Sequence, residues 1–166
     1  MIVSINQPAY LPWLGYFHRI FLSDVHVVLD HVQFEKNSFI NRNKIRTREG
    51  SIMLTVPLKT KGLFGNLEIN KVKIAGEDWR SKHFNSINYS YSKAKFFKKY
   101  QEILHNIYSQ EYVHLIDLIL PMNKWFMDEL YLNTKIILSS EIQENSPKSN
   151  LILNICKSLN ATTYLS

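Results

Sequence analysis

Two apolar runs near the amino terminus constrain the fold more than any other feature of this chain. The run IVSIN at 2–6 is rich in β-branched residues and ends at Gln7-Pro8, where a proline cannot continue a hydrogen-bonded ladder. The pattern LGYFHRIF at 14–21 has apolar residues at helical spacing, and VHVVLD at 25–30 is again almost continuously apolar. A strand, a short helix and a second strand in this order predict a right-handed β-α-β unit with parallel strands.

The middle of the chain predicts a hairpin and then a block of helices. We expect a polar loop over 31–50, with short strand pieces as an alternative. An antiparallel hairpin follows, formed by strands at 51–58 and 67–74 around a basic turn that contains glycine. Helical periodicity runs from 77 to 131, and we expect the last helix to end or kink at Leu120 because Pro121 follows.

The carboxyl-terminal part returns to the alternation of strand and helix. We expect a strand at 134–141, a helix at 150–160 and the start of another strand at 161–166. The whole pattern predicts an α/β fold over residues 1–166, a single domain with a mostly parallel central sheet, a β-hairpin insertion and a helical block. Because the chain stops within an apparent strand, we expect the domain to be truncated at its carboxyl terminus.

The composition is that of a globular protein with excess positive charge. Hydrophobic residues make up 45% of the chain and charged residues 20%, and no apolar run approaches the roughly 20 residues of a membrane span. The net charge of +6 favours anionic partners in general. The start lacks the basic and apolar regions of a signal peptide, and the single cysteine, Cys156, cannot form an internal disulfide. We therefore expect a cytoplasmic protein without a membrane span.

The segment QPAYLPWLG follows the first predicted strand directly, where ligands bind in open parallel sheets. Its two prolines fix the backbone, and Tyr10 and Trp13 supply flat surfaces. The segment could form the wall of a binding pocket, with Gln7, Tyr10 and Trp13 as substrate-binding residues. It could equally be an aromatic plug that closes one end of the sheet.

Polar residues after the second predicted strand are further candidates. Asp30 lies at the carboxyl end of that strand, and Gln33 follows shortly after, so both could bind a ribose or sugar hydroxyl. In NRNKIRTR, Arg42 could bind a phosphate through two parallel hydrogen bonds, although a basic run is as often a solvated face.

A histidine in WRSKHFNSINYSY is the main candidate for catalysis. Trp79, His83 and Ile87 share one helical face, which is also the arrangement of a hydrogen-bonded core histidine. As a general base near neutral pH, His83 would deprotonate an amine or a hydroxyl, with Trp79 beside the substrate. The histidine and cysteine spacing of zinc sites is absent, so we predict no metal site, and no motif indicates a cofactor.

Several motifs occur in one order along the chain: QPAYLPWLGYF, DVxVxLDxVQF, NRNKI, LTVP, WRxKH, SSE and ICxxLxAxxYLS. In this order they resemble the WbqC-like family of bacterial proteins over residues 2–166. Family members continue past the YLS stretch with a glycine-rich segment. The matching motifs favour Arg42 and Asn43 over the neighbouring basic residues as ligands of a nucleotide diphosphate, and they include His83.

The resemblance implies a role in the biosynthesis of O-antigen, the lipopolysaccharide side chain, or another surface polysaccharide. The partner would be a nucleotide-linked sugar or another phosphorylated small molecule, and the protein a transferase that adds an acyl or aminoacyl group to an amino sugar. A fainter similarity is to nucleotidyltransferases with an HxGH motif, although LPWLGYF stands in place of the two histidines.

Two readings of other classes stay open. A scaffold without enzymatic activity in a glycan assembly complex would need no complete catalytic constellation, and none is visible. Nucleic-acid binding would use the basic charge and the aromatic residues of KAKFFKKY. Helical spacing in that segment would bury part of the aromatic surface, and no helix-turn-helix motif is present, which argues against nucleic acid. The sequence does not indicate an oligomeric state.

Overall fold

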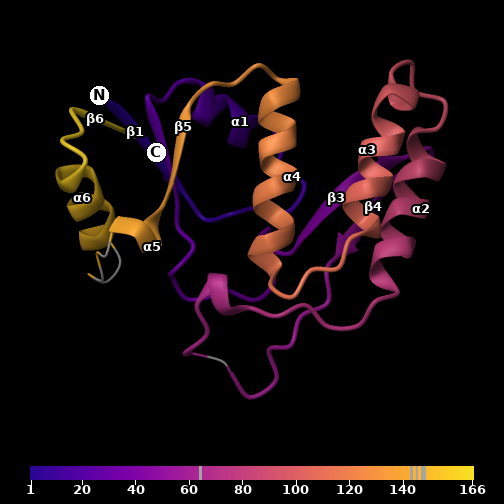
Figure 1. Cartoon of the computed structure of the whole chain (residues 1–166), viewed down its shortest axis with the longest axis horizontal. Helices are drawn as coiled ribbons and strands as arrows, with labels where there is room; N and C mark the ends of the chain where they lie inside the picture. The colour runs from indigo at the N-terminus through magenta and orange to yellow at the C-terminus, as the bar shows by residue number, and fades with distance from the viewer. Residues whose placement is uncertain (64, 143, 145, 147–148) are drawn as a thin grey trace.

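A parallel sheet of four strands forms one end of the molecule (Figure 1). The computed structural model describes residues 1–63, 65–142, 144, 146 and 149–166. In spatial order the strands are β5 (Lys135–Leu138), β2 (Val25–Val28), β1 (Ile2–Asn6) and β6 (Thr163–Leu165). Every neighbouring pair is parallel, and Val3 lies opposite Val25 in the register of β1 with β2. The predicted α/β fold with a parallel sheet is therefore confirmed.

Helices cover both faces of this sheet, as alternation along the strands requires. On one face, apolar side chains of β1 and β2 pack against Leu151 and Ile155 of α6 (Ser149–Ser158). On the other face, α1 (Leu14–Phe21) packs with the end of α4 (Leu115–Glu129) and with Ile136 of β5. The chain adds β2 and β5 on one side of β1 and then β6 on the other. This reversal is a topological switch point, where ligands bind in many open sheets.

An antiparallel hairpin lies beside the helical block, but it is not the predicted one. It consists of β3 (Arg42–Thr47) and β4 (Gly50–Thr55), so part of the expected loop over 31–50 is strand, as the alternative of short strand pieces allowed. Segments 51–58 and 67–74 share only the isolated bridge of Leu58 with Ile74, and η1 (Ile69–Lys71) interrupts the second segment. Its alternating pattern comes instead from residues that contact the core, namely Leu67, Ile69, Val72 and Ile74.

The helical block consists of α2 (Trp79–Tyr91), α3 (Phe97–Ser109) and α4. The expected break at Leu120 is wrong, because α4 continues through Pro121 to Glu129. Pro121 is exposed, whereas Leu118, Ile119 and Met122 around it are fully buried, and their packing maintains the helix. The predicted late strand is shorter than expected, because α5 (Ser139–Ile142) begins directly after β5. Among the described helices, none is long and apolar enough to cross a membrane.

Candidate functional site

Asp30 lies just beyond β2 in a closed polar cluster. Its carboxylate accepts hydrogen bonds from the Ser139 hydroxyl (3.0 Å), the Ser140 hydroxyl (2.6 Å) and the Ser140 backbone N–H (2.9 Å). Asn70 Nδ2 donates a longer one at 3.3 Å. Only 2% of Asp30 is exposed, so its oxygens bind the protein and are poorly accessible to a ligand.

Electrostatics agree with a structural role for this carboxylate. Burial alone would raise the pKa of Asp30, but the hydrogen bonds from Ser140 and Ser139 outweigh that effect and lower the pKa below its ordinary value. The serines belong to the SSE motif, which follows β5, the strand beside β2. From the sequence alone, these two serines had no assigned role. The position of the motif at the end of a neighbouring parallel strand was the signal that it meets Asp30.

Gln33 and Gln7 differ in what their side chains contact. The Gln33 side chain accepts a hydrogen bond from Leu67 N–H (3.1 Å) and donates one to the Phe34 carbonyl (3.0 Å), so it ties together two backbone segments. Gln7 is half-buried at the carboxyl end of β1, and no side-chain hydrogen bond joins it to the described residues. Of these two candidates, Gln7 has the amide group that is available to a ligand.

His83 lies in a buried cluster of aromatic rings and hydroxyl groups. Its Nδ1 is 2.8 Å from the Tyr10 hydroxyl, which in turn is 2.5 Å from the Tyr108 hydroxyl. The Trp79 ring packs edge to face on His83, with ring centroids 5.3 Å apart. The structure thus joins three predicted site residues, Tyr10, Trp79 and His83. Tyr108, which sequence reasoning missed, is 98 residues from Tyr10 along the chain.

Burial sets the protonation states in this cluster. It lowers the pKa of His83 to about 4, although hydrogen bonding to the Thr55 backbone works in the opposite direction. Burial also raises the pKa of Tyr10 and of Tyr108. At neutral pH the imidazole is therefore uncharged and both phenols keep their protons. A neutral His83 can accept a proton or a hydrogen bond.

A cavity of about 400 Å³ opens onto Trp79 and His83. Its rim is the segment from Ala75 to Asp78, with Lys82 beside it, and its remaining wall is formed by Thr55 and Pro57. The rim carries charges of both signs, while the floor is aromatic. The buried cluster around His83 is therefore accessible from one side.

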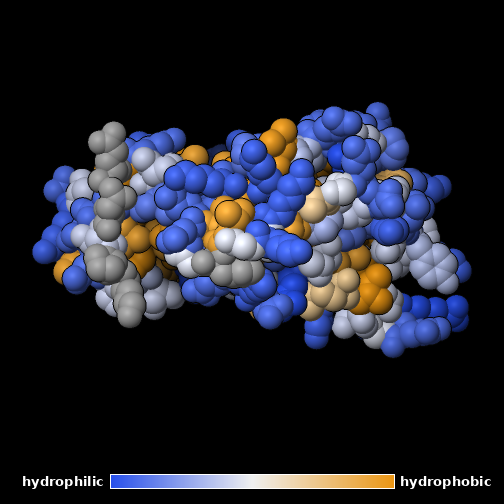
Figure 2. Space-filling view, turned by 90° about the horizontal axis from the view of Figure 1, so that it is seen from below, coloured by the Kyte–Doolittle hydropathy of each residue, from blue (hydrophilic) through white to orange (hydrophobic). Residues whose placement is uncertain are grey.

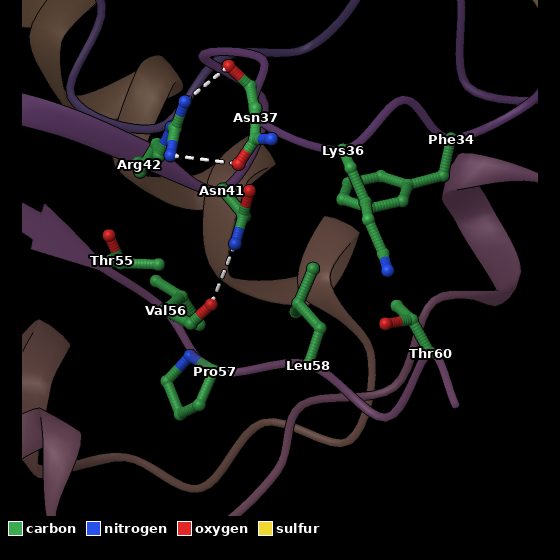
Figure 3. Close-up of a pocket in the computed structure, with 10 residues that line it drawn as sticks. All are labelled: Phe34, Lys36, Asn37, Asn41, Arg42, Thr55, Val56, Pro57, Leu58 and Thr60. Atoms are coloured by element: carbon green, nitrogen blue, oxygen red, sulfur yellow. Dashed lines mark hydrogen bonds between the residues drawn. The ribbon is translucent and has the colours of Figure 1, made fainter.

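A second cavity, of about 180 Å³, lies beside Arg42 (Figure 3). The Arg42 guanidinium donates to the Asn37 side chain (3.1 Å) and to the Asn37 carbonyl (2.5 Å). Asn41 donates to the Val56 carbonyl (2.8 Å), and the side chain of Lys36, on the same segment as Asn37, extends toward Thr60 on the segment that follows Pro57 (Figure 3). Cationic groups and amides line this small pocket, as they do in sites for anions.

The two cavities have Thr55 and Pro57 in common. These residues belong to the LTVP motif at the end of β4, so Arg42 and His83 lie on the two sides of one backbone segment. Asn43, the neighbour of Arg42, points the other way and donates to the Leu11 carbonyl (2.7 Å). Asn43 therefore holds QPAYLPWLG against the hairpin. The described contacts place Asp30 in a separate cluster.

The two aromatic residues of QPAYLPWLG, Tyr10 and Trp13, differ in burial. Tyr10 is fully buried in the His83 cluster, whereas Trp13 is 50% exposed and contacts Tyr16 and Phe39. Gly15 leaves room for the Trp13 indole, because a Cβ at Gly15 would lie 2.7 Å from Nε1. The segment is thus a plug at Tyr10 and an open aromatic surface at Trp13.

Within the described part of the chain, no three His, Cys, Asp or Glu side chains converge to hold a metal ion.

Comparisons with known proteins cover nearly the whole chain. The profile of the WbqC-like protein family matches residues 7–166. The uncharacterized protein Rv1507c of Mycobacterium tuberculosis is 32% identical over 165 residues, which cover 99% of this chain and 71% of that relative. No solved structure matches significantly.

Proposed function

This chain belongs to the WbqC-like protein family, and from that membership we propose that it acts in the biosynthesis of a bacterial surface polysaccharide. The ligand in this proposal is a nucleotide-linked amino sugar, and the reaction is transfer of an acyl or aminoacyl group to its amine. Nucleotide-linked sugars occur in the cytoplasm, which is where we place the protein. The net positive charge of +6 is favourable for such an anionic substrate.

The proposal depends on one observation, the shared wall between the Arg42 cavity and the His83 cavity. A ligand across Thr55 and Pro57 would place its diphosphate near Arg42 and its sugar near His83. The guanidinium is already oriented by Asn37, so little side-chain freedom is lost when a phosphate binds. Trp79 supplies an aromatic surface for the sugar ring on the other side.

His83 has a limited role in this chemistry. When the amine attacks the acyl carbonyl, the C–N bond forms, the donor's leaving group departs with its electron pair, and the amine must lose a proton. A pKa of about 4 makes His83 a weak base for a free amine. It is suited to take the proton from the much more acidic ammonium group of the tetrahedral intermediate. Tyr10 and Tyr108 would hold the ring in position for that step.

A binding experiment with matched variants tests the proposal. We would screen thermal stability against nucleotide sugars, free nucleotides, acyl donors and short oligonucleotides, in the parent chain and in Arg42→Ala, Arg46→Ala and His83→Gln. A ligand at 100 times its Kd should add about 2.7 kcal/mol of stability. We expect a nucleotide sugar to stabilise the parent, Arg46→Ala and His83→Gln, and to lose this effect in Arg42→Ala.

Arg46→Ala is a matched control for Arg42→Ala, because Arg46 lies on the same strand as Arg42 but outside its cavity. Acyl transfer to the bound amino sugar should then fail in His83→Gln while binding persists. Stabilisation by oligonucleotides alone would favour nucleic-acid binding. No stabilisation by any of these ligands would favour the role of a scaffold without enzymatic activity. Either result would contradict the proposal that the protein is a transferase.

A further inference from the structure

A further cavity lies among the helices and β3. It has a volume of about 590 Å³, within the roughly 300 to 1,000 Å³ typical of small-molecule pockets. Its walls come from the end of the QPAYLPWLG segment, the start of α1, β3, the helices α2 and α3 with the turn between them, and the end of α4. The cavity has no lining residue in common with the two cavities beside Thr55.

Side chains in this cavity are almost all apolar or aromatic. Its interior includes Ile87, Phe97 and Leu104, which are buried, and Trp125 and Phe126 of α4. Large apolar residues also stand at its rim in water, with Leu14 79% exposed and Phe96 63% exposed. By contrast, the face seen from below is mainly hydrophilic with separate apolar groups (Figure 2). An exposed apolar rim around an apolar cavity is typical of a binding site for a hydrophobic ligand.

Charges at the cavity indicate what kind of ligand it would take. Lys44 and Lys95 line it, and neither forms an ion pair with a carboxylate among the described residues. The acidic lining residue, Glu129, is already bound to Lys99 at 2.8 Å. The cavity therefore has an apolar interior with uncompensated positive charge, which is complementary to an anionic amphiphile.

We propose that this cavity binds the hydrocarbon chain of a lipid with an anionic head group, the chain among the aromatic residues and the head group near Lys44 and Lys95. The same chemistry is found in a linear fatty acid and in an isoprenoid phosphate. This site is additional to the proposed nucleotide-sugar site. Because the two share no lining residue, either can fail without the other.

Displacement of a fluorescent fatty acid from the full chain would test the site. We would titrate linear carboxylates of increasing length, dodecanol as an uncharged control, and farnesyl phosphate as the isoprenoid arm. Affinity should rise about fourfold per added methylene until the cavity is full. Dodecanoate should bind more tightly than dodecanol. Preference for farnesyl phosphate would support the site and assign the isoprenoid as its source of ligand.

Two pairs of variants distinguish specific binding in the cavity from nonspecific hydrophobic binding. Ala94 is exposed and lines the cavity, so Ala94→Trp should fill it without disturbing the core and lower affinity at least about tenfold. Ser92→Trp, in the same turn but outside the cavity, should bind like the parent. Lys95→Glu should weaken dodecanoate binding about two- to fivefold and leave dodecanol binding unchanged, whereas Lys93→Glu should leave the binding of both ligands unchanged.

Failure would be equally clear in this assay. Binding that does not saturate, or equal affinity in Ala94→Trp and Ser92→Trp, would overturn the proposal. Equal losses in Lys95→Glu and Lys93→Glu would overturn its anionic part, because they would show only an effect of net charge.

Discussion

Asp30 and His83 are both buried polar residues predicted for the site, and their surroundings are opposite in kind. Asp30 is a charged group whose oxygens accept hydrogen bonds from Ser139, Ser140 and Asn70. His83 is a neutral ring hydrogen-bonded to the Tyr10 hydroxyl, and its cluster borders a cavity. Asp30 therefore stabilises the contact between β2 and β5, while the neutral His83 ring, although hydrogen-bonded to Tyr10 and to the Thr55 backbone, also lines a cavity. Burial and polarity alone would not have distinguished them.

The largest effect should come from breaking the Asp30 cluster. Asp30→Ala should lower the free energy of unfolding by about 3 to 5 kcal/mol, because several buried donors lose their acceptor at once. Asp30→Asn keeps the shape but cannot accept at both positions, so its loss should be smaller. Urea unfolding gives both values. A loss below about 1 kcal/mol in Asp30→Ala would mean that water replaces the carboxylate and that the cluster is not structural.

The two residues should also respond to acid in different pH ranges. The folded pKa of His83 is about 4, below its ordinary 6.5, so the unfolded chain binds more protons between these values. Stability from this residue is complete above pH 6.5 and is lost as the pH falls to about 4. The folded pKa of Asp30 is also lowered, from 3.8, so its contribution persists through that window and is lost only at still lower pH.

Unfolding measured at several pH values would sharpen this difference. Each depressed histidine should add a slope of up to about 1.4 kcal/mol per pH unit between pH 6.5 and 4. His26, fully buried and also with a pKa of about 4, should contribute a second such term. His83→Gln and His26→Gln should each remove the contribution of one histidine to this dependence of the free energy of unfolding on pH. An unchanged slope in His83→Gln would show that its ring titrates alike in the folded and unfolded chain.

Sequence patterns predicted the elements whose burial is regular and missed those whose burial is sparse. The runs at 2–6 and 25–30 contain three and four consecutive buried residues, so their strands were recognisable. The strand β3 has only one buried residue, Ile45, among charged neighbours, and its sequence resembles a loop. In 67–74 the reverse occurred, because core contacts produced alternation without a ladder.

The sequence could predict which residues belong to the candidate site, but not which of them contact one another. The Tyr10 and Tyr108 hydroxyls meet across 98 positions, and Asp30 meets Ser139 across 109. No local periodicity encodes contacts at such separations. The first joins the segment after β1 to α3, and the second arises because β5 pairs with β2. The order of strands in a sheet would have been needed to predict the second contact.

A smaller effect should follow from cutting the hydrogen bonds of the His83 cluster without changing its packing. Tyr10→Phe removes the hydroxyl between His83 and Tyr108 and should cost about 1 to 3 kcal/mol. Tyr89→Phe is the matched control, because Tyr89 is 86% exposed and should cost almost nothing. If both changes are neutral, a water molecule replaces the lost hydroxyl. The cluster would then be wetter than the Asp30 cluster, which would strengthen the contrast between the two.

The smallest effect on stability is expected at the other end of the same segment. Trp13 is half exposed, with an edge-to-face contact to Tyr16 and a tilted contact to Phe39, so Trp13→Ala should cost about 1 kcal/mol. As a plug, Trp13 would cost about 3 to 5 kcal/mol on truncation and have no effect specific to a ligand. As a binding surface, it would cost little stability and lower the affinity for a nucleotide sugar. Measuring unfolding and ligand affinity on this one variant separates the two roles, because each role predicts a loss where the other predicts none.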